Sequence, residues 1–318
     1  MKRFLSLLVL FSIVPFFSLS QSCLPEGIRF MTQDEVDNFR INHPNCTEIE
    51  GDVEITLSSI SNLDSLYVIT SIGGNLELNK NSSLTSISGL SNLTTVEGRI
   101  NLWDNNLTDL TGLNGLVTIG EGLAITSMAS LTSLSGLDNL TSIGSGLQIT
   151  DNFELENLTG LEKLNSIGES SLIIRGNTKL IDITGIENIE AGTIELLQIK
   201  WNTILAVCDV QSVCDYLAAP SGTVDISDNA TGCVSQAEVE GACGTSVNEI
   251  FIANKISTTP NPFTTSSTLS YTLKQPSSVQ LSIYDQLGRL VFQHTEEHQQ
   301  GEQQLLWDAT NQADGLYF

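Results

Sequence analysis

Pairs of apolar residues separated by one residue recur at nearly constant spacing through the middle of the chain. The first residue of each pair falls at eight positions, and the steps between them are 23, 24, 23, 24, 25, 25 and 27 residues. Such alternation is typical of a β-strand with one buried face. The chain therefore contains a true repeat with one strand in each unit, beginning at Val53, Leu76, Ile100, Leu123, Leu147, Leu172, Leu197 and Val224.

Other apolar positions recur every third residue within a unit and align between units. This spacing, with frequent Gly, Asn and Thr, favours short strands and turns over helices, which need a period near 3.6. One unit cannot bury its own apolar face, so the units must stack, and seven steps of ~4.8 Å give a solenoid roughly 34 Å long. Its core is predicted to be filled by two columns: Ile60, Leu84, Leu107, Leu131, Leu155, Leu180 and Leu205, and Leu66, Leu90, Leu113, Leu137, Leu161 and Ile186.

Asparagine also recurs once in most units. An amide offers two donors and an acceptor, so it can satisfy backbone groups that a tight bend leaves unpaired. We therefore predict a structural ladder of stacked amides, and not a row of ligand-binding residues. Met128 interrupts this ladder, and its unit is expected to bend differently or loosen. The positions are Ser58, Asn81, Asn105, Met128, Asn152, Asn177, Asn202 and Asn229.

The two ends of the repeat carry the six cysteines of the chain. An even number of cysteines in an exported chain predicts disulfides and not a metal site. Cys23 and Cys46 bracket a capping-box motif, Thr32-Gln-Asp-Glu35, which predicts a short helix through Arg40, and these two cysteines are expected to pair. At the other end, helices are predicted from Val210 to Leu217 and from Ser235, with a strand at 224–226. Three pairings remain open for Cys208, Cys214, Cys233 and Cys243.

The N-terminus predicts export. Lys2 and Arg3 precede an apolar run over 4–17, followed by small residues before Gln21, which is the order of a secretory signal peptide. The run is too short to span a bilayer as a helix, so no transmembrane anchor is expected. The predicted divisions are a signal peptide (1–20), an N-terminal cap (21–50), a repeat domain with its cysteine cap (51–245), a linker (246–259) and a C-terminal domain (260–318).

The charge of the chain argues against nucleic acid as a partner. The formal net charge is −24, and residues 51–245 contain six Lys and Arg against 24 Asp and Glu. Phosphate backbones require clustered cations, whereas an acidic surface keeps an exported protein soluble. No histidine falls in 51–245, which removes histidine-based catalysis there, and no metal or other cofactor is predicted. His294 and His298 in the tail lie in a predicted strand, which is a poor arrangement for a metal pair.

The repeat resembles the receptor L-domain within the leucine-rich-repeat group, over roughly 51–243. The resemblance rests on Gly74-Asn-Leu-Glu-Leu78, on Asn152, on the Gly-Leu pairs at 89–90, 112–113, 136–137 and 160–161, and on the ending from Cys208 to Cys233. It implies a right-handed β-solenoid whose usual work is recognition. It does not name a ligand.

The C-terminal segment has short alternating strands that predict a small, immunoglobulin-like β-sandwich. They fall at 268–273, 279–284, 290–292, 305–307 and 316–318, with a turn at 285–288. Asn261-Pro-Phe263, the segment 282–289, Trp307-Asp-Ala-Thr-Asn311 and Gly315-Leu-Tyr-Phe318 resemble the type A C-terminal sorting domain of the type IX secretion system. This resemblance implies export by that machinery to the surface of a Gram-negative bacterium, and such domains normally continue beyond this Tyr-Phe, so the domain is expected to be truncated.

The candidate binding residues lie between and after the inward-facing positions of the strands. Exposed tryptophans commonly stack on sugars or anchor protein partners, so Trp103 and Trp201 are the main candidates. The set of candidates is Trp103, Gln148, Arg175, Lys200 and Trp201, on a face that also includes Glu77, Asn79, Asn101, Thr150 and Gln198.

The sequence therefore predicts a secreted or cell-surface binding and adhesion protein that recognises a glycan or a protein and is not an enzyme. A glycan-cleaving enzyme on a β-solenoid is the first alternative, since Asp151, Glu154 and Glu156 cluster at one turn and could supply an acid and a base. A structural surface spacer without a specific ligand is the second.

Overall fold

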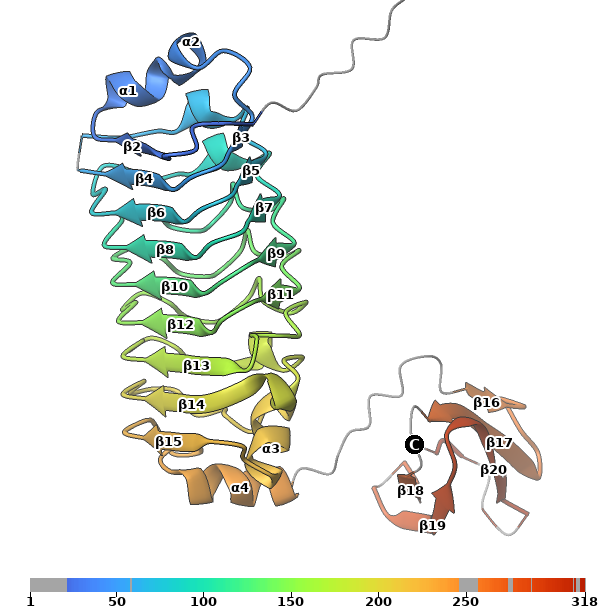
Figure 1. Cartoon of the computed structure of the whole chain (residues 1–318). Helices are drawn as coiled ribbons and strands as arrows, with labels where there is room; N and C mark the ends of the chain where they lie inside the picture. Colours follow the sequence, from blue (N-terminus) through green and yellow to red (C-terminus); the bar gives the residue numbers. More distant parts are fainter. Residues whose placement is uncertain are drawn as a thin grey trace, which may run out of the picture. The chain divides into compact units, whose positions relative to one another are not determined.

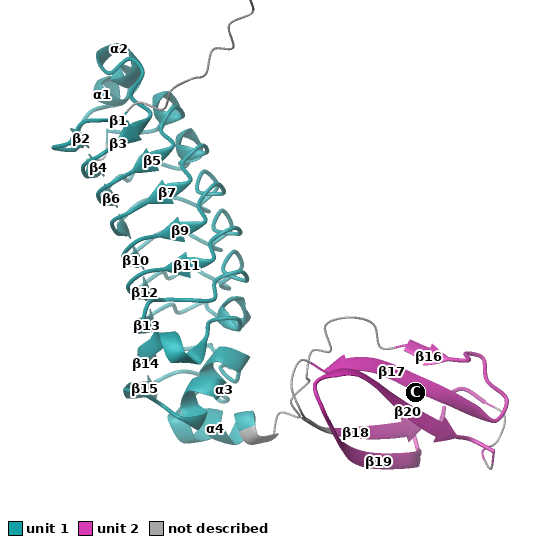
Figure 2. Ribbon diagram, turned by 45° about the vertical axis from the view of Figure 1, so that its right-hand side comes forward, with its two compact units in different colours: residues 1–245 teal, residues 246–318 magenta. Residues whose placement is uncertain are grey.

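The computed structural model describes residues 22–57, 59–245, 257–273, 277–286, 288–310, 312 and 315–317. The chain divides into two compact units, 1–245 and 246–318 (Figure 2). The predicted signal peptide, most of the predicted linker, Ser58 and Phe318 lie outside the described residues.

A nine-stranded parallel sheet runs along the first unit, with one strand from each of the eight repeats and one, β2, from the N-terminal cap (Figure 1). The equivalent apolar residues pair in register from Val53 through to Val224, as the repeat alignment predicts. The chain is thus mainly β, and its stacked parallel strands are consistent with a β-solenoid. In spatial order the strands are β15 (Thr223–Ser227), β14 (Ile194–Lys200), β13 (Ser170–Arg175), β12 (Leu147–Thr150), β10 (Leu123–Thr126), β8 (Ile100–Trp103), β6 (Leu76–Asn79), β4 (Val53–Thr56) and β2 (Ile28–Phe30).

A second parallel sheet of two-residue strands lies on another side of the repeats. Its order is β1 (Ser22–Cys23), β3 (Glu48–Ile49), β5 (Ser71–Ile72), β7 (Thr95–Val96), β9 (Thr118–Ile119) and β11 (Ser142–Ile143). Three repeats also contain 3-10 turns: η1 (Asp64–Leu66) and η2 (Ser88–Leu90) in one repeat each, and η3 (Thr184–Ile186) and η4 (Ala191–Thr193) in the same repeat. Short strands and turns thus replace helices within the repeats, in agreement with the three-residue spacing.

The two predicted leucine columns fill the core. Every residue of both columns has 0% exposed surface, and all of them belong to one continuous apolar cluster. Burial of such a column removes apolar surface from water only when neighbouring repeats are in place. The central prediction of the sequence analysis, a core sealed by stacking, is confirmed.

The predicted asparagine ladder is present at the corner that follows each strand of the nine-stranded sheet. The residue just before each ladder position has a positive φ, which turns the chain sharply out of the strand. The asparagine side chain of the following repeat bonds to backbone groups on both sides of this bend. At the corner after β12, Asn177 Nδ2 donates to the Ile149 carbonyl at 2.9 Å, and Asn177 Oδ1 accepts from the backbone N–H of Asn152 at 3.0 Å. The same pattern holds at Asn105, Asn152, Asn202 and Asn229.

The prediction that the Met128 repeat loosens is wrong. Met128 is fully buried, and β10 pairs in register with both neighbouring strands. The Met128 backbone N–H still donates to Asn152 Oδ1 at 3.0 Å, and Met128 Sδ lies 3.8 Å from Asn105 Nδ2 as a weak acceptor. A flexible thioether therefore fills the amide position without disturbing the stack.

The N-terminal end is closed by two short helices and a disulfide. The capping box at Thr32 and Glu35 starts α1 (Gln33–Asp37) as predicted, but the helix does not continue to Arg40. Asn38 ends α1 because its side-chain Nδ2 donates to the Asp34 carbonyl at 2.7 Å, and α2 (Phe39–Asn42) follows. The predicted disulfide between Cys23 and Cys46 is present.

The C-terminal end has the predicted helix–strand–helix order. The elements are α3 (Gln211–Ala218), β15 and α4 (Gln236–Thr245), whose N-terminal turn is capped by Ser235. The structure selects one of the three open pairings, Cys208–Cys233 and Cys214–Cys243. Cys208 and Cys233 are buried against the last repeat, so this disulfide also covers the end of the core.

The second unit has two small antiparallel sheets. One consists of β16 (Ser257–Thr259), β17 (Ser266–Leu273) and β20 (Gly301–Asp308), and the other of β18 (Ser277–Tyr284) and β19 (Leu290–His298). The sequence analysis places 257–259 in the linker, whereas these residues pair with β17. This strand cannot be recognised from the pattern of apolar residues, because its three residues are Ser-Thr-Thr and all are exposed.

Candidate functional site

The outward-facing side chains of the nine-stranded sheet form two rows, which we call the outer face. The first row lies between the two buried positions of each strand, and the second row follows the second buried position. From β4 to β15 the first row is Glu54, Glu77, Asn101, Ala124, Gln148, Ile173, Gln198 and Asp225. The second row is Thr56, Asn79, Trp103, Thr126, Thr150, Arg175, Lys200 and Ser227.

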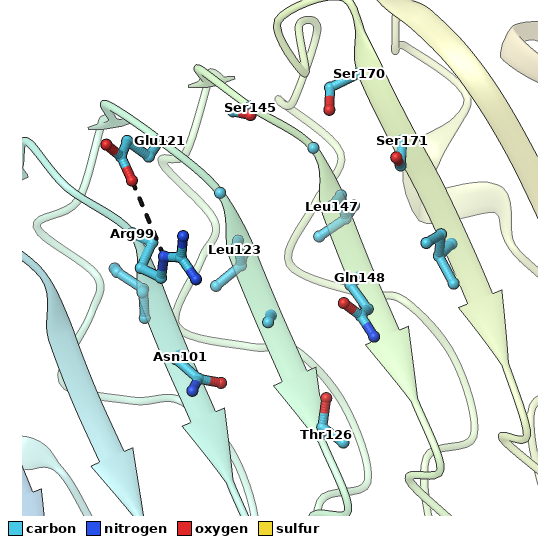
Figure 3. Close-up of a pocket in the computed structure, with 15 residues that line it drawn as sticks. Arg99, Asn101, Glu121, Leu123, Thr126, Ser145, Leu147, Gln148, Ser170 and Ser171 are labelled. Atoms are coloured by element: carbon cyan, nitrogen blue, oxygen red, sulfur yellow. Dashed lines mark ion pairs between the residues drawn. The ribbon is translucent and has the colours of Figure 1, made fainter.

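An open groove of about 420 Å³ lies on the outer face across β8, β10, β12 and β13. Ala124 is the smallest side chain of the first row, and Gly122 and Gly146 add none before their strands, so the surface is hollowed there. Figure 3 shows Asn101 and Gln148 on strands to either side of β10, facing the same side of the sheet. The groove therefore offers amide donors and acceptors on both of its walls.

Charge is present at one end of this groove. Arg99 Nε lies 3.9 Å from Glu121 Oε2, and both side chains are more than half exposed (Figure 3). Such a pair contributes little to stability, because solvent screens it. Its two polar groups remain accessible to a ligand, as do the hydroxyls of Ser145, Ser170 and Ser171 that line the same end.

Trp103 stands beside the groove in the second row. Its side chain is 39% exposed, and the Lys80 ammonium from the preceding corner lies 4.6 Å from its ring centroid. A cation at this distance is attracted by the indole π-face. The indole of Trp103 is therefore a partly exposed aromatic surface in contact with Lys80, and it is not part of the core.

The second tryptophan lies with two of the other predicted residues. Trp201 occupies the corner after β14 with φ of 58° and is 43% exposed. The Arg175 guanidinium lies 4.3 Å from its ring centroid, and Lys200 Nζ lies 5.1 Å from it. The structure thus brings Arg175, Lys200 and Trp201 together.

Lys200 is also tied to the last strand. Its Nζ lies 3.2 Å from Asp225 Oδ2, and Gln198 and Ser227 donate to the same carboxylate. Burial alone would raise the pKa of Asp225, but the hydrogen bonds from Lys200, Ser227 and Gln198 outweigh it and hold this pKa below its usual value. Asp225 is thus a carboxylate at neutral pH and neutralises much of the Lys200 charge.

The structure corrects one residue of the predicted face. Thr150 is 4% exposed and not open to solvent, because its hydroxyl pairs with that of Thr126 at 3.0 Å between β10 and β12. Of the five candidates, Gln148 lines the groove, Trp103 stands next to it, and the Arg175 cluster lies towards β14. Asn101, which the sequence places on this face, lines the groove. Sequence reasoning missed Lys80 and Ala124 as parts of the site, although the small size of Ala124 in a row of larger side chains is a signal of the groove.

One of the three carboxylates considered for catalysis, Glu154, has a cationic partner. Glu154 forms an ion pair with Lys179 at 2.6 Å, and this hydrogen bond raises the pKa of the Lys179 ammonium above its usual value. Asp151 lies in a corner with φ of 57°. Among the described residues there is no group of three or more His, Cys, Asp or Glu placed to hold a metal ion.

Two segments of the chain match known families. Residues 45–108 match the Receptor L domain, and residues 258–318 match the secretion system C-terminal sorting domain, the type IX tail. Both resemblances drawn from the sequence are thereby confirmed. Comparison with curated proteins and with solved structures gives no match.

The sorting domain determines where the protein acts. A chain with this tail interacts with the type IX secretion machinery and is secreted or displayed at the cell surface. Within the described residues, no helix combines the length and the apolar character needed to cross a membrane.

Proposed function

We propose that the repeat domain is a recognition module of the cell surface, which binds a glycan or a protein through its outer face and serves adhesion. The observation that carries this proposal is the pair of partly exposed tryptophans, Trp103 on the outer face and Trp201 at its corner, with a polar groove beside Trp103. Indole rings give large contact areas and have little conformational freedom to lose on binding. Parallel strands with buried flanking residues hold both rings in place before a ligand arrives.

Binding without cleavage is part of the proposal. The face with the tryptophans has amides, hydroxyls and charges. Its acidic residues have partners: Glu54 has Arg29, Glu77 has the Asn79 amide, Glu121 has Arg99 and Asp225 has Lys200. A glycan-cleaving site requires one carboxyl acid and one carboxylate at the scissile bond. The acidic cluster around Glu154, which motivates the enzyme alternative, lies past the corner and pairs with Lys179.

Three finer features belong to the same proposal. The repeat domain forms a right-handed solenoid of the L-domain type, and the two sheets of the second unit form an immunoglobulin-like sandwich. Residues 1–20 act as the signal peptide that brings the chain to the periplasm before export. The parallel sheets and the sorting tail support these features.

Alanine at Trp103 and at Trp201 is expected to weaken ligand binding by at least about tenfold each, since a buried aromatic anchor contributes 2 kcal/mol or more. Thermal stability should remain nearly unchanged, because both rings are partly exposed already. The measurement is binding of the purified protein to a glycan and protein array, followed by titration with the ligand identified and by a melting curve.

Phe153→Ala is the matched control, since Phe153 is 53% exposed and lies beyond the corner, off the outer face. Its removal should leave binding intact. Large losses of stability in both tryptophan variants would instead identify core residues. Release of products from a glycan in a parallel degradation screen would favour the enzyme alternative, and no binding to either array would favour the spacer.

A further inference from the structure

The cations of the repeat domain gather on the outer face. The sequence has eight Lys and Arg between residues 22 and 245, and five of them lie on this face or at its corner: Arg29, Lys80, Arg99, Arg175 and Lys200. The other surfaces have most of the acidic residues and only three cations. An anionic ligand is therefore repelled least at this face, where the five cations offset part of the charge of carboxylates such as Glu54, Glu77 and Asp225.

Two of these five cations are not neutralised by a carboxylate. Arg29 pairs with Glu54, Arg99 with Glu121, and Lys200 with Asp225. Lys80 and Arg175 form no ion pair within the described part of the chain, and each lies over an indole instead. A cation that lies over a ring still has N–H groups that point away from the ring and can donate to a ligand. Such charge-assisted hydrogen bonds are stronger than those between neutral groups.

Each pair consists of one cation and one indole, Lys80 with Trp103 and Arg175 with Trp201. The two pairs lie at opposite ends of one stretch of the second row and its corner, which we call the track. Lys80 follows β6 and Arg175 ends β13, four strand steps apart, which corresponds to roughly 19 Å at the usual strand spacing. Between them the second row has Thr126 and Thr150, whose hydroxyls bond to each other and leave a low surface. The groove with Gln148 runs beside this track.

We propose that the ligand of the outer face is an anionic sugar chain, with its acid groups bound by Lys80 and Arg175 and its sugar rings packed against the exposed parts of the Trp103 and Trp201 indoles. This inference rests on the proposed function, and it adds the chemical class of the ligand. An acidic sugar presents an apolar ring face and a carboxylate or sulfate on the same unit, which matches an indole and a cation held 4.3 to 4.6 Å apart.

Carboxylates at the same corner fit a sugar better than a simple polyanion. Asp104, Asp151 and Asp228 occupy corner positions near these pairs, and the Asp151 carboxylate lies where a Cβ at Gly176 would be. Such groups accept hydrogen bonds from ring hydroxyls, but they repel a chain that has only negative charges. The same corner therefore offers cations for acid groups and carboxylates for hydroxyls.

The test is calorimetric titration of the full protein with three hexasaccharides: a galacturonate (carboxylated), a heparin fragment (sulfated) and cellohexaose (neutral). The anionic hexasaccharide that binds identifies the acid group, and its affinity should fall about tenfold in Lys80→Gln and in Arg175→Gln, the loss of one charge-assisted contact. Lys163→Gln removes the same charge from an exposed side chain that bonds only to Asn139 among the described residues, and it should bind within about twofold of the unchanged protein.

The outcomes separate this inference from the proposed function. Tryptophan-dependent binding of cellohexaose with no preference for either acidic chain would overturn the inference and leave the proposed function standing. Equal affinity for polyglutamate, which has charge but no sugar ring, would also overturn it. Binding of any probe that is insensitive to the tryptophan and cation variants alike would refute both.

Discussion

Replacing Asn177 with alanine is expected to lower the free energy of unfolding by about 2 to 4 kcal/mol, since each buried backbone group left unpaired costs about 1 to 3 kcal/mol. Asn177 has 0% exposed surface and joins three repeats through its amide. The variant removes the partner of the Ile149 carbonyl and of the Asn152 backbone N–H at a corner that water cannot reach. Urea unfolding followed by circular dichroism measures the change.

The matched control is Asn188→Ala. Asn188 also donates its side-chain amide to a backbone carbonyl of the preceding repeat, that of Glu162 at 2.9 Å, but it is exposed. Water replaces this bond, so the loss should stay below about 1 kcal/mol. Equal losses in the two variants would show that the buried ladder is not what holds the corners.

Alanine at Leu180 is expected to destabilise the protein by about 2 to 5 kcal/mol, the usual range for truncation of a buried leucine. Leu180 is fully buried in its column, so the cavity would open inside the core between neighbouring repeats. Because stacked repeats can unfold in parts, hydrogen exchange of the neighbouring strands should accompany the denaturation curve.

The adjacent residue provides the control for this variant. Ile181 is 52% exposed and has nearly the same side-chain volume as Leu180, so Ile181→Ala should cost less than about 1 kcal/mol. Comparable effects at the two positions would contradict the assignment of alternate residues to the core and to the surface.

The repeat and its core could be predicted from the sequence because they depend on spacing. Residues at one position of every unit must meet when the units stack, so the alignment of Val53 with Leu76 and onward fixes both the register and the columns. The capping box at Thr32 and the asparagine ladder are similarly local, since each satisfies backbone groups within or next to its own turn.

Features that depend on the size of neighbouring side chains could not be predicted in this way. The groove exists because Ala124 stands between larger residues on adjacent strands, and Thr150 is buried because Thr126 lies opposite to it. Met128 was expected to weaken the stack, but the pattern does not show that a thioether can fill an amide position. The cysteine pairing in the C-terminal cap likewise depends on how α3 and α4 fold back.

The sequence predicts which face of the sheet has the candidate site, but it does not predict which side chains contact one another there. Alternation placed Trp103, Gln148, Arg175 and Lys200 on one side of a sheet, and the structure agrees. The stacking of Lys80 on Trp103 and of Arg175 on Trp201 joins residues 23 and 26 positions apart. These contacts form because one repeat length brings the two residues to neighbouring strands and the sharp corner turns one side chain towards the other. The alternation of apolar residues does not indicate such a corner.

The central claim is that a ligand lies across the two exposed indoles, and tryptophan fluorescence tests it most directly. Trp307, the third tryptophan, is 6% exposed and packs against Phe263 and Tyr317 in the second unit, so Trp307→Phe leaves Trp103 and Trp201 as the only emitters. Addition of the ligand found by the arrays should shift and saturate this emission at the concentration that saturates binding. Full binding with unchanged emission would place the ligand elsewhere on the protein.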